Sequence, residues 1–246
     1  MPENPGPSTA SPRLLAIDTA TEIVAVAACG PAGLVTRTAP GGAEASASLL
    51  PAVQAVLAEA GLVATDLDAI AFGAGPGAFT GLRTACAAAQ GLAFGLGCPL
   101  LPLDDLALWA EDSPWRDEAG GPLVWVAVDA RMGEVYAAAY RRVAPATWQA
   151  DVAPALYTLD ALAAAFAAVP PRRLAGNAPA ALGDRWPVTA AAVHVTLHDR
   201  PAALLRLAAS AWQRGEAIDP AQALPLYLRD KVALTTAERA ARQAAT

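Results

Sequence analysis

The chain has 246 residues, of which 55% are apolar and 16% charged, and its formal net charge is −6. This composition excludes a disordered chain, and the length fits one large domain or two small ones. A protein that binds RNA by itself usually carries a basic face. Only the arginine pairs Arg141–Arg142 and Arg172–Arg173 offer one here, so we expect no independent RNA binding.

The N-terminal residues 1–12 are rich in Pro, Ser and Gly and are expected to form a disordered tail without signal-peptide character. The cysteines Cys29, Cys86 and Cys98 form no C-x-x-C pair, and we expect small core residues in a reducing compartment. No apolar stretch reaches about 20 residues, the length of a membrane span. We therefore expect a cytoplasmic protein.

The first half of the chain predicts alternating strands and helices. The apolar run Leu14–Ile17 is typical of a strand buried on both faces. Further elements are expected in this order: strands Ile23–Ala28 and Leu34–Ala39, helix Ser48–Ala60, strand Asp68–Phe72, helix Leu82–Leu96 with Thr80 as N-cap, strand Pro99–Leu103 and helix Asp105–Glu111. This order predicts a mixed sheet with helices on its faces.

A glycine-rich loop, Gly73–Gly81, lies between a predicted strand and a predicted helix, where backbone N–H groups can bind an anion. It lacks the G-K-[ST] ending of a P-loop, and Arg83 is its only nearby cation. The alternative is a tight loop whose glycines let the helix approach the sheet. The residues favour this second interpretation.

The second half repeats the opening pattern. A polar segment, Asp112–Pro122, indicates a boundary between lobes. After it, "VWVAVDARMGEVYAAAY" resembles "LLAIDTATEIVAVAA", with Asp129 in the place of Asp18, which favours a duplicated domain over two unrelated hairpins. The expected divisions are a first lobe at 13–111, a second lobe at 112–236 and a frayed tail at 237–246. Expected later elements are helix Leu159–Ala168, strands Arg172–Gly176 and Val193–Leu197, helix Pro201–Arg214 and a strand- or loop-like Pro225–Ala233.

Two histidines, His194 and His198, have the spacing that brings zinc ligands together on a helix. The β-branched residues between them indicate a strand instead. Along a strand the pair would lie about 13 Å apart, too far for one metal ion. We expect no metal site here.

Four segments together resemble the TsaB (YeaZ) family: "LLAIDTAT" at Leu14, "GAGPGAFTGLRTACAAAQGLAFG" at Gly73, "VAVDARMGEVYAA" at Val126 and "PLYLRDKVA" at Pro225. The resemblance implies an α/β, two-lobed fold of the actin, sugar kinase and Hsp70 type, a duplicated RNase H-like fold with mixed central sheets. It also implies a part in forming N6-threonylcarbamoyladenosine in tRNAs that read codons starting with A. The implied partners are the paralogous catalyst TsaD, in a heterodimer, and the ATPase TsaE, while a homodimer is an alternative. Contact with tRNA would then occur only through the complex.

The same resemblance argues against independent catalysis. The TsaD family has a histidine pair in its first lobe, whereas the matching region here, "EASASLLP", contains none. No nucleophile–base pattern for peptide hydrolysis is present either. We therefore expect a non-catalytic scaffold that binds no cofactor tightly, with ATP and magnesium at most in the complex. The alternative is an autonomous ATPase or phosphotransferase of the actin-like class.

By analogy with the fold class, a nucleotide cleft in vestigial form would involve a set of acidic and glycine residues. Its expected members are Asp18, Gly75, Gly77, Asp129 and Glu134. The alternative is that these carboxylates cap hairpins, with Glu134 paired to Arg131 across its turn.

The predicted helix Leu82–Leu96 is apolar nearly all round, with Gln90 its only strongly polar residue after Ala85. Such a helix must be covered on most sides, either by its own chain or by a partner. We expect a partner interface made of Leu49, Leu50, Val53, Leu57, Arg83, Ala85, Ala89, Gln90 and Leu92. Ala89→Glu is then expected to prevent docking without unfolding the chain.

Overall fold

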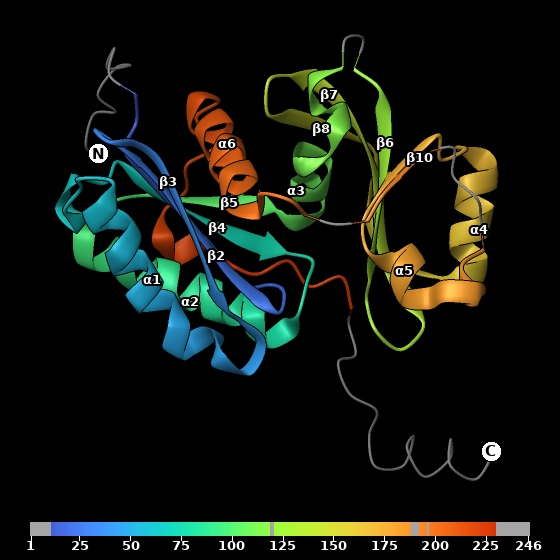
Figure 1. Ribbon diagram of the computed structural model, residues 1–246, viewed down its shortest axis with the longest axis horizontal. Coiled ribbons are helices and arrows are strands. Elements are labelled where there is room, and N and C mark those ends of the chain that lie inside the picture. The colour runs from blue at the N-terminus through green and yellow to red at the C-terminus, as the bar shows by residue number, and fades with distance from the viewer. Residues whose placement is uncertain (1–10, 119–120, 188–191, 196, 230–246) are drawn as a thin grey trace, which may run out of the picture.

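A computed structural model describes residues 11–118, 121–187, 192–195 and 197–229. Within these residues the strands form two five-stranded sheets, one in each lobe (Figure 1). The predicted tails at 1–12 and 237–246 lie outside the described residues, apart from Ser11 and Pro12.

The two sheets have the same topology. The first sheet, in the order β3-β2-β1-β4-β5, contains β1 (Leu14–Asp18), β2 (Ile23–Gly30), β3 (Gly33–Pro40), β4 (Ala69–Gly75) and β5 (Leu100–Asp104). The second, in the order β10-β9-β6-β7-β8, contains β6 (Leu123–Asp129), β7 (Glu134–Ala144), β8 (Thr147–Thr158), β9 (Arg173–Ala175) and β10 (Ala192–His194). In both, the first three strands are antiparallel neighbours and the last two are parallel to the first. The duplication expected from the sequence is confirmed, and this is the two-lobed, actin-like α/β fold.

Helices cover both faces of each sheet. They are α1 (Ala45–Glu59), α2 (Phe79–Leu96), α3 (Asp105–Asp112), α4 (Leu159–Ala168), α5 (Ala178–Leu182) and α6 (Arg200–Gln213). Helices α1 and α2 lie side by side on one face of the first sheet, and α4 and α5 on the far face of the second (Figure 1). Among the described residues, no helix combines the length and the hydrophobicity needed to cross a membrane.

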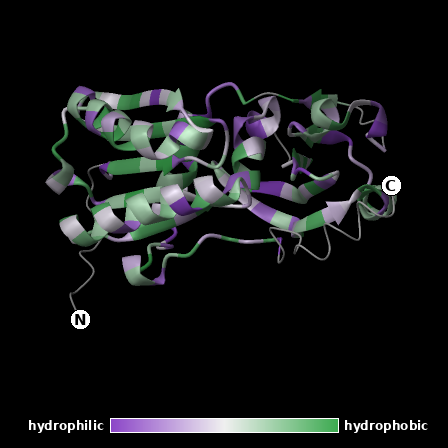
Figure 2. Ribbon diagram, turned by 90° about the horizontal axis from the view of Figure 1, so that it is seen from below, coloured by the Kyte–Doolittle hydropathy of each residue, from purple (hydrophilic) through white to green (hydrophobic). Residues whose placement is uncertain are grey.

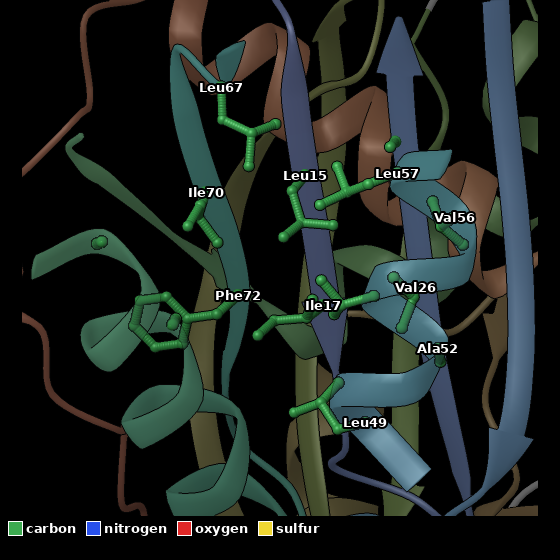
Figure 3. Packing of buried hydrophobic residues seen from close by; sticks show 14 of the residues in the cluster. Leu15, Ile17, Val26, Leu49, Ala52, Val56, Leu57, Leu67, Ile70 and Phe72 are labelled. Atoms are coloured by element: carbon green, nitrogen blue, oxygen red, sulfur yellow. The ribbon is translucent and has the colours of Figure 1, made fainter. Parts of the chain in front are cut away.

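The core beneath α1 and α2 follows from the alternation of side chains along the strands. Leu15 and Ile17 of β1 point to the same face as Ile70 and Phe72 of β4, and Val56 of α1 packs against them (Figure 3). Strands β1, β2 and β4 in the middle of the first sheet are predominantly hydrophobic, because both of their faces are covered (Figure 2), whereas the edge strand β3 is largely exposed. Each such fully buried side chain contributes about 1.5–3 kcal/mol to stability.

Helices α3 and α6 cross between the lobes. Helix α3 follows β5 of the first sheet, but Leu106 and Trp109 pack on β6 and β7 of the second. Helix α6 follows β10 of the second sheet, but Leu204 and Ala208 pack on β1 and β4 of the first. Although Arg200–Gln213 falls within the predicted second lobe, 112–236, it therefore covers the first sheet.

Several local predictions differ from the structure. Helix α1 begins at Ala45 rather than Ser48, and the N-cap of α2 is Ala78 rather than Thr80, with no side-chain cap bond. The predicted strand Val193–Leu197 is β10, which ends at His194. Strand β8 was not predicted, because its sequence "TWQADVAPALYT" is largely exposed and interrupted by a proline.

Candidate functional site

A cleft of about 420 Å³ lies between the two lobes. On the first lobe it is lined by the β1–β2 turn and the start of α2, and on the second by the β6–β7 turn and the start of α5. The C-terminal segment at Leu226–Arg229 lines it as well. A cleft of this size is within the usual range for small-molecule sites.

Asp18 does not face this cleft. Its side chain is fully buried, Oδ1 accepts a hydrogen bond of 2.7 Å from the backbone N–H of Ala20, and Oδ2 forms an ion pair with Arg200. The Arg200 guanidinium also lies 3.6 Å from Oδ1 of Asp105. The carboxylate of Asp18 is therefore engaged by α6.

Asp105 is the second carboxyl of this buried cluster. It is 3% exposed, and within the described part of the chain neither of its side-chain oxygens has a hydrogen-bond partner. Burial, and then the nearby charge of Asp18, raise its pKa well above the ordinary value. The neighbouring Asp104 also has a raised pKa because of burial, and it accepts a short hydrogen bond from the hydroxyl of Tyr140 in the second lobe.

Asp129 lines the cleft, and its carboxylate caps its own hairpin. Oδ1 accepts a bond of 3.0 Å from the backbone N–H of Arg131, the same capping bond that Asp18 makes in the first lobe. The backbone N–H of Asp129 donates to the side chain of Asn177 at 2.9 Å. The hairpin-capping interpretation therefore describes both aspartates.

Glu134 does not pair with Arg131 as the sequence suggested. It forms an ion pair of 2.7 Å with Arg229, from the C-terminal segment. The Arg131 guanidinium instead lies 3.8 Å from Asp129 of its own hairpin and 3.7 Å from Glu22, which belongs to the β1–β2 turn of the first lobe. Proximity in sequence misled the prediction, because the turn directs Arg131 away from Glu134.

The glycines of the loop after β4 allow close approach within the chain. A Cβ atom at Gly75, whose φ is +122°, would lie 2.7 Å from the carbonyl oxygen of Leu226. One at Gly77 would lie 2.7 Å from Cβ of Ala20. Both positions allow close approach within the chain, but the neighbour at Gly75 is the C-terminal segment rather than the helix-to-sheet contact of the second interpretation.

Of the three acids predicted for a magnesium–nucleotide site, only Asp129 lines the cleft. Asp18 is buried against Arg200, and Glu134 is neutralised by Arg229. Among the described residues, no group of three or more His, Cys, Asp and Glu is placed to hold a metal ion.

The histidine pair is closer than predicted. Strand β10 ends at His194, and the ring centroids of His194 and His198 are 5.0 Å apart. The separation of about 13 Å expected for a continuous strand is therefore wrong. Burial lowers the pKa of His194. Asp112, the last residue of α3, accepts hydrogen bonds from the backbone N–H groups of His198 and Asp199, just before α6. These bonds connect the two helices that cross between the lobes.

The predicted partner interface is divided by the fold. Five of its nine residues are buried in the first-lobe core and cannot contact a partner in this conformation: Leu49, Val53, Leu57, Ala85 and Ala89. Leu50 is 48% exposed, Arg83 is exposed, and Gln90 and Leu92 are half-buried. The amide of Gln90 donates to the backbone carbonyls of Pro220 and Ala223, so it holds the chain's own C-terminal segment.

The exposed sides of α1 and α2 form what we call the outer helical face. It consists of Leu50, Gln54, Arg83, Ala87, Gly91 and Phe94. Phe94 is 61% exposed, which is high for a phenylalanine, and a Cβ atom at Gly91 would meet no other atom within 4 Å. Four of these six residues were not predicted: Gln54 on α1, and Ala87, Gly91 and Phe94 on α2. No local pattern selects the three residues on α2, because nearly all side chains of this helix are small or apolar.

Three residues that line the cleft were also missed: Phe79, Tyr227 and Arg229. Tyr227 and Arg229 belong to a segment without helix or strand, nearly 150 residues from Phe79 in the chain. No periodicity or spacing in the sequence pairs these positions.

Comparisons of the sequence and of the structure with known proteins give consistent matches. A family model described as "TsaD: tRNA N6-adenosine threonylcarbamoyltransferase" matches residues 40–235. The chain is 34% identical over 229 residues to the tRNA threonylcarbamoyladenosine biosynthesis protein TsaB of Escherichia coli (strain K12), covering 90% of this chain and 96% of that protein. Its structure is similar to that of YeaZ from Pseudomonas aeruginosa, with a TM-score of 0.76 and 36% identity, covering 88% of this chain and 100% of that one.

Proposed function

Since this chain belongs to the TsaB family of tRNA threonylcarbamoyladenosine biosynthesis proteins, we propose that it is a non-catalytic scaffold of that pathway. In this proposal it forms a heterodimer with TsaD and favours the active state of that enzyme. A ligand shifts an equilibrium only by its difference in affinity for the two states. The scaffold must therefore bind the active conformation of TsaD more tightly than the inactive one.

The ion pair between Asp18 and Arg200 is the observation that supports a non-catalytic role for this chain. The carboxylate that ends β1 is the one that the fold class suggests for a nucleotide or metal. Here it is fully buried and neutralised by a guanidinium from α6. Removing Arg200 would leave a buried, unpaired charge, so this pair is not readily exchanged for a substrate.

The outer helical face supports the docking part. Its exposed residues include one charged side chain, Arg83, and two large apolar ones, Leu50 and Phe94. Ala87 and Gly91 are small and lie four positions apart, so another helix could approach α2 closely between them. Exposed apolar surfaces of this kind are typical of protein interfaces.

Two further parts of the proposal concern the larger assembly. The net charge of this chain is −6, and its sequence predicts no basic face. We therefore propose that it contacts tRNA only through the complex. The proposed location is the cytoplasm. The ATPase TsaE is proposed to join the heterodimer, and any ATP and magnesium to bind in the complex rather than to this chain alone. A homodimer through the same face is the alternative resting state.

The decisive experiment is reconstitution of tRNA modification from purified components with and without this chain. We expect tRNA modification only when this chain is present, and we expect the chain to co-elute with TsaD. A preparation of TsaD that modifies tRNA equally well alone would contradict the proposal.

The docking face is tested by Ala87→Glu in the same assay. Because Ala87 is exposed on α2, the variant should fold normally but lose co-elution with TsaD. The matched control is Ala164→Glu, at an exposed alanine in the middle of α4 in the second lobe. If both variants bind TsaD like the unmodified chain, the outer helical face is not the docking surface.

An autonomous ATPase or phosphotransferase is the second candidate, favoured only by the cleft of about 420 Å³ between the lobes. A nucleotide that binds the folded chain must raise its melting temperature. Because Asp18 and Glu134 are paired with arginines, we expect no shift in a titration of the isolated chain with magnesium-ATP. A saturable rise would favour this candidate.

A further inference from the structure

The segment Ala223–Arg229, which we call the strap, runs from the first lobe to the second. It has no regular secondary structure, and Figure 1 shows it as the red chain that leaves the helices of the first lobe and crosses towards the second sheet. Its last four residues, Leu226 to Arg229, line the cleft between the lobes. The strap therefore lies where a ligand bound between the lobes would contact both of them.

The strap is fixed to the first lobe through its backbone. The N–H of Leu226 donates to the carbonyl of Ala74 at the end of β4, at 2.7 Å. The absence of a side chain at Gly75 allows this approach. In the second half of α2, the amide of Gln90 donates to the carbonyl of Ala223 at 3.2 Å. These bonds hold the strap at the end of β4 and against α2.

Tyr227 adds a side-chain anchor on the first lobe. Its ring lies 5.2 Å from that of Phe79, and its hydroxyl accepts a hydrogen bond of 3.0 Å from Nε of Arg83. The Arg83 guanidinium also lies 3.9 Å above the Phe79 ring. Aromatic and cation–π contacts of this type each add modest stability.

Arg229 attaches the strap to the second lobe. Only 12% of its side chain is exposed, and its guanidinium forms an ion pair of 2.7 Å with Glu134. It also donates to the carbonyls of Ala130 and Arg131, at 2.9 and 3.4 Å. These carbonyls belong to the β6–β7 turn, so one guanidinium holds both arms of the hairpin.

The turn that Arg229 holds is under strain. Arg131 and Met132 have φ values of +64° and +58°, in the left-handed region that residues other than glycine rarely adopt. Conformations of this kind persist only where the surroundings enforce them. The contacts of Arg229 to the turn are of the kind that can enforce it.

We propose that the strap is a latch that fixes the two lobes across the cleft, with Tyr227 as its anchor on the first lobe and Arg229 on the second. The strap takes the bridging position that a ligand occupies in proteins whose lobes close on a substrate. Releasing either anchor then loosens the strap and the β6–β7 turn together. This proposal concerns the chain by itself and does not depend on the docking of TsaD.

Hydrogen–deuterium exchange on the full chain tests the latch. In the unmodified protein the N–H groups of Ala130 and Glu134 are hydrogen-bonded within the turn, so their exchange reports its opening. Arg229→Ala should accelerate this exchange by about tenfold or more, since charged hydrogen bonds are among the stronger ones. Tyr227→Ala should also accelerate it, although Tyr227 lies on the other lobe.

The controls separate a latch from a local effect. Arg37→Ala removes an arginine from an exposed ion pair with Glu59 on the first lobe and should leave the turn unchanged. Tyr227→Phe keeps the ring but loses the bond to Arg83, so it should give a smaller acceleration than Tyr227→Ala. Fast exchange of the turn in Arg229→Ala but unchanged exchange in both Tyr227 variants would make Arg229 a local turn cap and overturn the latch. Unchanged exchange in Arg229→Ala would overturn it as well.

Discussion

Two buried carboxyl groups share one guanidinium where β1 meets α3 and α6. Arg200 forms an ion pair with Asp18 and lies 3.6 Å from Asp105, so a single positive charge faces two acids. Burying a second negative charge without a partner would be costly. The raised pKa of Asp105 follows from this imbalance, because protonation removes one of the two buried negative charges.

This arrangement predicts a pH dependence of stability. The pKa of Asp105 is higher in the folded chain than in the unfolded chain, where it is about 3.9. The stabilisation by protonated Asp105 is therefore complete below the unfolded pKa and is lost as the pH rises through the folded pKa. Asp105→Asn cannot ionise and lacks this dependence. The free energy of unfolding of the unmodified chain should therefore fall relative to that of the variant as the pH is raised from about 4. Urea unfolding of both proteins across this range measures it, and a constant difference would contradict the prediction.

Ala89 gives a second prediction, which replaces the one made from the sequence. The side chain is fully buried against the first sheet, so Ala89→Glu places a charge in the core. We expect a loss of about 3 kcal/mol or more in the free energy of unfolding, or failure to fold. Ala87→Glu, two positions along α2 and exposed, is the control and should stay within about 1 kcal/mol of the unmodified chain. Equal stability of the two variants would show that this face of α2 is not buried.

At the scale of the elements, the sequence was most successful where a strand or helix has one dominant pattern. Strand β1 is a continuous apolar run, and α4 was predicted with its observed bounds, Leu159–Ala168. Strand β8 was missed because it lies at the edge of its sheet with irregular pairing to β7. The rotation of α2 could not be predicted either, since nearly all of its residues are small or apolar. Only the sheet beneath it decides which of its sides is buried.

The glycines of α2 test this rotation. A Cβ atom at Gly81 would lie 2.0 Å from the carbonyl oxygen of Thr19, whereas one at Gly95 would meet no atom within 4 Å. Gly95→Ala should therefore stabilise the chain by about 0.5–1 kcal/mol, the gain in helix propensity. Gly81→Ala should destabilise it, because backbone would have to move. Thermal or urea unfolding distinguishes the two, and a stabilising Gly81→Ala would show that α2 does not approach the β1–β2 turn this closely.

At the scale of the whole molecule, the exchange of α3 and α6 makes the lobes interdependent. The face of the first sheet opposite α1 and α2 is covered by α6, whose sequence follows the second sheet. Leu14, Leu101 and Leu103 would lose this cover if the chain were divided at the predicted lobe boundary. An apolar sheet face of this kind does not remain stable in water.

A fragment with residues 11–118 should therefore fail to fold on its own. It contains the whole first sheet and α3 but lacks α6. We expect aggregation or a non-cooperative thermal transition, whereas the full chain should unfold in a single transition. Circular dichroism and size-exclusion chromatography of both proteins measure this. A monomeric fragment with a cooperative transition would show that α6 is dispensable for the first lobe.

The sequence by itself determined the fold class, the duplication and the family, because these depend on the order of strands and helices and on motifs that are local in the chain. The tertiary structure alone decided the partners of the side chains: Arg200 for Asp18, Arg229 for Glu134, and the core of the first lobe for Ala89. The physical reason is that these pairings join residues far apart in sequence. Their distances follow from how α6 and the strap cross between the lobes, which no local pattern encodes.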